Sequence, residues 1–286
     1  MKDSHIVSIG EVLWDIMPSG KKLGGAPANF VFHTQNLGVS SIIISAIGDD
    51  LSGKEIKQTL QNKEVPYLFN LSENPTGTVT VKLNNGSPSY TIHENVAWDK
   101  IILNNEAKNI IKKAKAICFG SLAQRSTTSR NTIRNAIKLA PRDSLKIFDI
   151  NLRQHYYSKK LIQESLQLTN IFKLNIDELE ILKKFFNLDS CNKTASSQLL
   201  NQFDLKLLAL SNGGVDSMLI TKKCTSILPS PKVKIVDTVG AGDSFMATIV
   251  VGLLQNKPLK EIHQKAIDYS AKVCMHKGAT PKIEFI

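Results

Sequence analysis

The sequence has few residues that could cross-link the fold. Four cysteines occur in 286 residues, and no two of them form a CxxC pair or stand at metal-ligand spacing from a histidine. They are Cys118, Cys191, Cys224 and Cys274. Cys118 and Cys274 lie in apolar runs and are interpreted as small core residues. This pattern argues against a disulfide scaffold or a zinc module, and we expect a reducing, cytoplasmic environment.

Long hydrophobic runs are also missing. No apolar run reaches the length of about 18 residues that a membrane-spanning helix requires. The N-terminus lacks the charged-then-apolar pattern of a secretory signal. We therefore expect a protein that is neither exported nor bound to a membrane.

Acidic residues are scarce relative to basic ones. Asp and Glu number 25 against 36 Lys and Arg, which gives a net charge of +11. Such an excess can indicate nucleic-acid binding. Here the lysines are scattered in short clusters such as 112–115, without a basic tail or a basic stripe interleaved with aromatics. We interpret them as a solvated surface with some attraction for phosphorylated ligands, and we expect no nucleic-acid partner.

What is present is a globular composition, 42% hydrophobic and 21% charged, with alternating strand and helix patterns. The predicted strands are His5–Gly10, Ser41–Ile47, Ala116–Gly120, Leu145–Asp149, Ile171–Leu174 and Lys206–Ser211. The predicted helices are Ala28–Asn36, Gly53–Asn62, Asn105–Lys115, Ser129–Leu139, Lys160–Gln167, Asp177–Phe186, Ala195–Gln202, Asp243–Leu254 and Lys260–His276. The alternation predicts one compact α/β domain with a largely parallel sheet, which binds ligands beyond the carboxyl ends of its strands.

Two stretches depart from this alternation. Thr78–Leu83 alternates apolar and polar residues, a turn is predicted near Asn84-Asn85-Gly86, and the pattern resumes through Tyr90–Ile92. Glu11–Pro18 also reads as extended. Together they predict a small β-sheet beside the main layer, either a lid over the strand ends or a hairpin without a functional role.

The stretch from Ile235 to Gly252 passes from β-branched residues through Gly240-Ala241-Gly242 into a helical pattern. Small residues before a helix leave its first backbone N–H groups open to an anion. Asp243 stands beside that opening. By itself it could complement the helix dipole, but an acid is also useful where an anion is about to be transferred.

Three further motifs carry polar groups to the same predicted edge. Gly24–Asn29 places two glycines before a helix, and Asn29 offers a donor and an acceptor for a polyol. Asp149–Arg153 and Asn175–Glu178 follow strands, where a carboxylate and an amide suit the water shell of Mg²⁺. The alternatives are a common turn for the two glycines, helix capping for Asn175 and Asp177, and a surface ion pair for Arg153. Ser211–Gly214 is a strand-end turn compatible with a nucleotide edge.

Six motifs in order resemble the ribokinase/PfkB family of sugar kinases across about the whole chain. They are Leu23–Asn29, Asn36–Gly38, Ile47–Gly53, Asp149–Arg153, Asn175–Glu178 and Asp237–Asp243. Within that family, Glu11–Asp15 and Tyr90–Asp99 resemble bacterial fructokinases most. The resemblance implies a single PfkB-type kinase domain over residues 1–286. It also implies a ribokinase-like three-layer α/β/α fold with a β lid from about 11–24 and 75–98, which in many members forms a homodimer contact.

The resemblance assigns roles residue by residue. Asp243 matches the catalytic base, which takes the proton of the sugar's primary hydroxyl, and the anion hole for the γ-phosphoryl matches Gly240, Ala241 and Gly242. The sugar hydroxyls are expected against Asp15, Gly24, Gly25 and Asn29. The cofactor ATP is expected against Asn175, Ser211, Gly213, Gly278 and Arg153. Glu178 matches a residue that organises Mg²⁺ through water, and a K⁺ site near Asp237 is left open.

The resemblance leaves some questions open. D-Fructose is the expected acceptor, with ribose, another ketose or a nucleoside as alternatives, and a catalytically inactive sugar- or nucleotide-binding regulator as the alternative outside enzymes. At the nucleotide turn, Asp216 replaces a glycine of the family pattern, which puts the contacts to the nucleotide in question if that position requires a positive φ.

Overall fold

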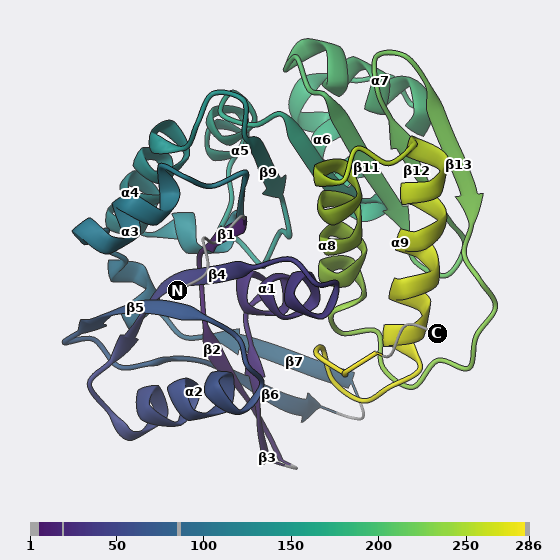
Figure 1. Ribbon diagram of the computed structural model, residues 1–286. Helices are drawn as coiled ribbons and strands as arrows, with labels where there is room; N and C mark the ends of the chain where they lie inside the picture. Colours follow the sequence, from purple (N-terminus) through teal and green to yellow (C-terminus); the bar gives the residue numbers. More distant parts are fainter. Residues whose placement is uncertain (1–5, 19, 85–86, 284–286) are drawn as a thin grey trace.

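A nine-stranded sheet forms the centre of the protein. The computed structural model describes residues 6–18, 20–84 and 87–283, and the strand order is β13-β12-β11-β10-β9-β8-β1-β4-β5 (Figure 1). These strands are β1 (Ile6–Ile9), β4 (Ser41–Gly48), β5 (Tyr67–Ser72), β8 (Ala116–Phe119), β9 (Leu145–Asp149), β10 (Ile171–Asn175), β11 (Leu207–Asn212), β12 (Asp216–Ile220) and β13 (Thr225–Pro229). The strands from β11 to β5 pair in parallel, whereas β12 and β13 pair antiparallel. The predicted, largely parallel sheet is confirmed, but β5, β12 and β13 were not predicted.

Helices cover both faces of this sheet. One layer contains α1 (Ala26–Asn36), α2 (Leu51–Asn62), α8 (Ala241–Leu254) and α9 (Leu259–Cys274). The other contains α3 (Asn105–Ile111), α4 (Thr127–Leu139), α5 (Lys159–Leu166), α6 (Ile176–Phe186) and α7 (Asn192–Gln202). Successive strand residues point to opposite layers: Ile6 packs with the α1/α8 layer, whereas Val7 packs with the α3–α7 layer. The three-layer prediction is therefore confirmed. Among the described residues, no helix combines the length and apolarity that crossing a membrane requires.

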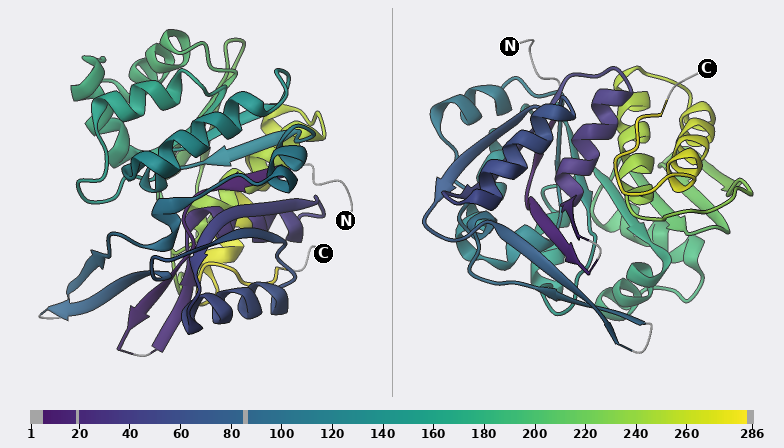
Figure 2. Two further views of the ribbon diagram at one scale, coloured as in Figure 1. Left: turned by 90° about the vertical axis from the view of Figure 1, so that its left-hand side faces the viewer. Right: turned by 90° about the horizontal axis from the view of Figure 1, so that it is seen from below.

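A second, four-stranded sheet projects from the main body (Figure 2). Its order is β3-β2-β6-β7, with β2 (Leu13–Met17), β3 (Gly20–Gly24), β6 (Gly77–Asn84) and β7 (Ser87–Ile92). These strands come from the two stretches in which the lid was predicted. The predicted turn at Asn85-Gly86 lies outside the described residues.

A buried ion pair connects the segment after β7 of this lid to the main body. Arg125 lies in a 3-10 turn that comes after β8 of the main sheet. Its Nε donates to Asp99 Oδ1 at 2.9 Å. A second nitrogen of Arg125 donates to the His93 carbonyl at 2.6 Å, just beyond β7. The guanidinium also lies 3.8 Å from the centre of the Trp98 ring, where cation and ring attract. The segment that follows β7 is thus fixed to the main body.

His33 joins α1 to the C-terminal part of the chain. Its Nε2 lies 2.9 Å from the Ala279 carbonyl and its Nδ1 lies 3.1 Å from the Tyr269 hydroxyl. Burial lowers the pKa of His33 to about 4, so the neutral ring makes both contacts at neutral pH. The loop around Ala279 is thereby tied to α1, the helix whose N-cap is Gly25.

The pH dependence of stability should reveal this contact. Because the folded-state pKa of His33 is lowered, its contribution is present above the unfolded pKa of about 6.5 and declines as the pH falls toward 4. We expect the stability advantage of the wild type over His33→Gln to shrink by about 2 kcal/mol between pH 7 and pH 5. Urea unfolding at both pH values measures it, with His276→Gln, an exposed histidine, as the matched control. Parallel pH curves for the wild type and His33→Gln would contradict the assignment.

Candidate active site

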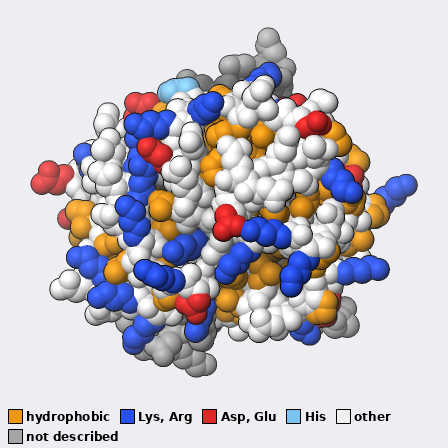
Figure 3. Space-filling model, turned by 90° about the horizontal axis from the view of Figure 1, so that it is seen from above, with side chains coloured by type: hydrophobic (Ala, Val, Ile, Leu, Met, Phe, Trp, Pro, Cys, Tyr) orange, Lys and Arg blue, Asp and Glu red, His pale blue; other side chains and the backbone are white. Residues whose placement is uncertain are grey.

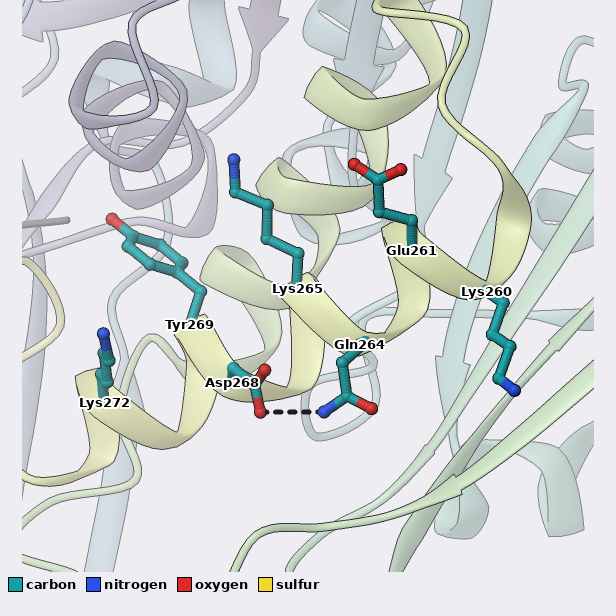
Figure 4. Close-up of a pocket in the computed structure, with 7 residues that line it drawn as sticks. All are labelled: Lys260, Glu261, Gln264, Lys265, Asp268, Tyr269 and Lys272. Atoms are coloured by element: carbon teal, nitrogen blue, oxygen red, sulfur yellow. Dashed lines mark hydrogen bonds between the residues drawn. The ribbon is translucent and has the colours of Figure 1, made fainter. Parts of the chain in front are cut away.

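One groove of the molecule can be set aside first. A groove of about 550 Å³ runs along α9 (Figure 4). It is lined by Lys260, Glu261, Gln264, Lys265, Asp268, Tyr269 and Lys272. Gln264 donates to Asp268 at 3.1 Å within it. None of the predicted site residues lies there, so this groove is not the candidate active site.

The predicted groups instead meet where the strands of the main sheet end. Asn29, in the first turn of α1, donates from Nδ2 to Asp243 Oδ2 at 2.8 Å, although 214 residues separate the two in sequence. Asp243 lies in the first turn of α8. The residue expected to bind a sugar hydroxyl and the residue expected to accept its proton are therefore in direct contact.

Backbone geometry opens the N-terminus of α8. Gly240 is the N-cap residue of α8, has a φ of 82°, and has no side chain that could cap the first N–H groups. A Cβ at Gly240 would collide with the carbonyl oxygen of Ala279. Only glycine fits this position. The Ala241 N–H donates to the Thr238 carbonyl at 3.3 Å, whereas the Gly242 N–H and the helix dipole remain where an anion could bind.

The environment of Asp243 raises its pKa to about 6. Burial contributes most, and the negative charge of Asp149 adds to it, whereas Lys173, the bond from Asn29 and Arg153 lower the pKa. The sequence alone gave no reason to expect a raised pKa for this carboxyl. A base with a pKa just below neutrality is ionised at pH 7 and can still accept a proton.

Lys173 is a site residue that the sequence did not predict. It lies on β10 with a side chain that is 8% exposed, and its Nζ donates to Asp149 Oδ1 at 2.9 Å. Burial opposes its charge, but Asp149, Glu178 and Asp243 outweigh burial and raise the pKa of Lys173. A Cβ at Gly242 would lie 2.8 Å from this Nζ. A permanent cation therefore touches the first turn of α8. One feature of the sequence could have indicated it, namely a lysine in the middle of an apolar strand.

Glu178 and Asn175 form a reciprocal cap at the start of α6. Asn175 Oδ1 accepts from the Glu178 N–H at 2.9 Å, and Glu178 Oε2 accepts from the Asn175 N–H at 2.8 Å. Glu178 Oε1 accepts from the Leu152 N–H at 2.8 Å. The capping alternative is thus observed, and the same carboxylate also fixes the loop after β9. Its oxygens keep lone pairs for water but are not free to move.

The acceptor side combines a lid residue with the loop before α1. Asp15 lies on β2, and a Cβ at Gly24 would collide with its Oδ2, so backbone and carboxylate approach closely. Burial raises the pKa of Asp15, whereas Arg153 and Lys22 lower it. Gly25, with a φ of 113°, is the N-cap of α1 and packs against the Glu11 carbonyl. Asp15 thus lies against Gly24, and Gly25 directly precedes the helix that carries Asn29.

Glu11 is a second residue to which the sequence assigned no role of its own. Its side chain is buried, and its Oε2 has no hydrogen-bond partner among the described residues. Burial raises the pKa of Glu11 to about 7, and the Asp243 charge contributes to the rise. Arg153 opposes the rise for Glu11 as it does for Asp15 and Asp243. Arg153 therefore acts on three acceptor-side carboxyls, and its expected contact with the cofactor stays a prediction.

The groups expected around the nucleotide lie at the end of β11 and in the loops beside α8. Gly213 has a φ of 52°, whereas Asp216 lies in strand β12 and accepts from Asn212 Nδ2 at 3.0 Å. Asp216 therefore avoids the strain considered for it. Asp237 Oδ2 accepts from the Gly278 N–H at 2.9 Å. This bond joins the loop in which the K⁺ site was predicted to the loop that was predicted to meet the cofactor, and Ser211 is the last but one residue of β11.

Comparisons with known proteins show the family to which the chain belongs. The model of the pfkB family carbohydrate kinases matches residues 10–285. The chain belongs to the pfkB family of carbohydrate kinases. The uncharacterised sugar kinase PH1459 of Pyrococcus horikoshii is 32% identical over 273 residues, which cover 89% of this chain and 84% of that protein. A fructokinase of Rhizobium leguminosarum bv. trifolii is 24% identical over 292 residues, 97% of this chain and 87% of that protein.

A solved structure extends the likeness to three dimensions. The crystal structure of PH1459 in complex with ATP aligns with a TM-score of 0.82 at 30% identity, covering 96% of this chain and 94% of that chain. The predicted family and the ribokinase-like fold of this pfkB member are confirmed. The single-domain boundaries, the site residues, the K⁺ site at Asp237 and a homodimer through the lid stay predictions.

The residues of this pfkB kinase fit a magnesium ion held through water. The described residues contain no group of three or more His, Cys, Asp or Glu that could enclose a metal. Mg²⁺ keeps several waters and takes one or two carboxylates together with substrate phosphates. Burial, together with the charge of Asp149, raises the pKa of Glu178, against the opposing effect of Lys173. Asp149 and Glu178 are the carboxylates that would organise such waters.

Proposed function

We propose that this protein transfers the γ-phosphoryl of Mg-ATP to the primary hydroxyl of a sugar. D-Fructose, giving fructose 6-phosphate, is the first candidate, and ribose, another ketose or a nucleoside are the alternatives. The contact of Asn29 with Asp243 at the open N-terminus of α8 carries the proposal. It brings a polyol-binding amide, a base and an anion-binding helix end to one point.

The acceptor hydroxyl would be activated by Asp243. Asn29 fixes one carboxylate oxygen of Asp243, which leaves the other oxygen for the proton of the hydroxyl. The pKa of about 6 means that Asp243 is ionised at pH 7 yet basic enough to receive a proton late in the transfer. A general base of this kind contributes about 10²–10⁴-fold to the rate.

The transferring phosphoryl group would be held by the first turn of α8 and by Lys173. Phosphoryl transfer needs alignment and charge stabilisation more than covalent help. The N–H groups near Gly240 and Gly242 are oriented before the reaction, and Lys173 adds a buried positive charge beside them. Mg²⁺, when bound, supplies further neutralisation of the phosphate oxygens.

The lid would exclude water and complete the acceptor pocket. Asp15 lies on the lid strand β2, while its neighbours Gly24 and Gly25 lead into α1. Closure of the lid over the strand ends therefore moves Asp15 with respect to Asp243. Excluding water favours the sugar hydroxyl over hydrolysis of the nucleotide.

Release of ADP from Mg-ATP in the presence of different acceptors tests the proposal. Fructose, ribose, tagatose, glucose, mannose and adenosine are compared under one set of conditions. We expect fructose to give the highest kcat/KM. A higher value for another acceptor removes the fructose assignment only, whereas no acceptor-dependent ADP release with any of them removes the kinase proposal.

Asp15→Asn should affect acceptor binding more than chemistry. A charge-assisted hydrogen bond to a hydroxyl is worth about 1.5–3 kcal/mol, so we expect the acceptor KM to rise about 10- to 100-fold with kcat within a few-fold. Steady-state kinetics with fructose and with ATP varied separately measure this. Asp143→Asn, an exposed carboxylate at the opposite edge of the sheet, is the matched control. A rise in the KM for ATP instead would place Asp15 on the nucleotide side.

A further inference from the structure

The edge of the main sheet opposite the active site carries a basic groove. It has a volume of about 760 Å³ and lies at the amino ends of β9, β10 and β11 and at the turn between β12 and β13. Six cations line it: Lys138, Arg142, Lys146, Lys206, Lys222 and Lys223. Seen from above in the orientation of Figure 1, Lys and Arg side chains spread across this face of the molecule (Figure 3).

The cations form two groups on either side of a neutral centre. Lys138, Arg142 and Lys146 come from the end of α4 and the start of β9. Lys206, Lys222 and Lys223 come from the start of β11 and the turn after β12. The uncharged residues 167–170 lead into β10, which lies between β9 and β11 in the sheet. Since neighbouring strands are about 4.8 Å apart, the two groups face each other across about 10 Å or more.

Most of these cations lack a compensating carboxylate. Asp204 is the acid that lines the groove, and it pairs with Lys222. The described residues give no ion-pair partner to the other five. Like charges held around one concave surface repel one another, and an anion placed between them relieves that repulsion.

The volume and lining of the groove indicate which kind of anion it can hold. Pockets for small molecules have volumes of about 300–1,000 Å³, and this groove falls within that range. Its floor includes the buried Leu205 and the partly buried Leu168 and Phe203. An apolar floor between two cationic walls suits a short carbon chain with a charge at each end. Lys and Arg are the residues that most often bind phosphate.

We propose that this groove binds a small molecule that carries a phosphate group at each of its two ends. The site is separate from the turnover site, because the five residues of β10 span about 16 Å between the two edges of the sheet. The molecule would bind without displacing either substrate. This inference does not depend on the identity of the acceptor sugar.

Fructose 1,6-bisphosphate is the probe, because it has a phosphate at both ends of a six-carbon chain. Calorimetric titration at about 0.15 M ionic strength is run with saturating Mg-ADP present. We expect the bisphosphate to bind at least tenfold more tightly than fructose 6-phosphate or inorganic phosphate. Lys146→Gln/Lys206→Gln, with one change in each wall, should weaken bisphosphate binding at least tenfold and leave kcat unchanged.

Lys54→Gln/Lys108→Gln is the matched control, since it removes the same charge from exposed lysines outside the groove. We expect bisphosphate affinity in this control within twofold of the wild type. Equal losses in both double variants would reduce the effect to net charge. An unchanged affinity in the groove variant would place the bisphosphate elsewhere, the turnover site included. Tighter binding of single-stranded DNA than of the bisphosphate would make this face a surface for polyanions. Each of these three results overturns the proposal.

Discussion

Asp243→Asn is expected to lower kcat at least about 10²-fold while the protein stays folded. The amide keeps an oxygen that can accept from Asn29 Nδ2, as the carboxylate does at 2.8 Å, but it cannot take the proton of an acceptor hydroxyl. Single-turnover ADP release measures the loss, with Asp143→Asn as the matched control. Near-normal turnover in Asp243→Asn would remove this residue from the role of base.

The same variant should gain stability at neutral pH. A carboxyl whose folded-state pKa is raised, here from 3.8 to about 6, favours the folded state below its unfolded pKa and loses this advantage as the pH rises through 6. The ionised, partly buried Asp243 therefore costs stability at pH 7, by about 1–3 kcal/mol. Asp243→Asn should unfold at higher urea concentration at pH 7 and match the wild type near pH 4. An inactive variant that is also less stable at pH 7 would indicate a damaged fold instead.

The pH profile gives an independent measure of the same group. Because a general base must be ionised in the free enzyme, kcat/KM for the wild type should rise through about pH 6 and level off above it. Glu11 lies in the same region with a pKa raised to about 7. Repeating the profile with Glu11→Gln shows which carboxyl causes the rise. If kcat/KM of this variant still rises near pH 6, the rise belongs to Asp243.

The alternation of strand and helix patterns predicted most of the fold. It also predicted where the site lies, because parallel strands bring their carboxyl ends to one edge of the sheet however far apart they are in sequence. Asn29 and Asp243 could thus be expected near each other, although their direct bond could not. Three strands were not predicted, and two of them, β5 and β13, lie at the edges of the main sheet. Strand β13 is half-exposed and short, and β5 lies at the other sheet edge, so neither has the continuous apolar run that marks a buried strand.

The site residues that the sequence did not reveal are those whose chemistry depends on burial. In the sequence, Lys173 is a single polar residue within an apolar strand. Only the fold shows that it lies between Asp149 and Gly242. The raised pKa values of Glu11 and Asp243 likewise arise from desolvation and from neighbouring charges that come from distant strands. Conversely, Asp216 was questioned because it replaces a glycine of the family pattern, and in the fold it is the first residue of β12 and pairs with Asn212.

Lys173→Met is expected to have the second large effect, on stability and on turnover together. The ion pair with Asp149 has side chains only 8% and 9% exposed, so removal of Lys173 leaves a buried carboxylate without its partner. Breaking a buried pair in this way costs about 3–5 kcal/mol. If Lys173 also stabilises the transferring phosphoryl group, kcat should fall about 10²–10³-fold, the usual effect of removing one preorganised donor.

The double variant Lys173→Met/Asp149→Asn separates these two roles. Neutralising Asp149 removes the unpaired charge, so most of the lost stability should return. The charge beside Gly242 stays absent, and we therefore expect kcat to stay at least 10²-fold below that of the wild type. Because Asp149 itself raises the pKa of Asp243, Asp149→Asn alone is measured in parallel to show its separate effect on the base. Recovery of kcat together with stability in the double variant would reduce Lys173 to a structural counterion, whereas recovery of stability alone assigns its charge to the reaction.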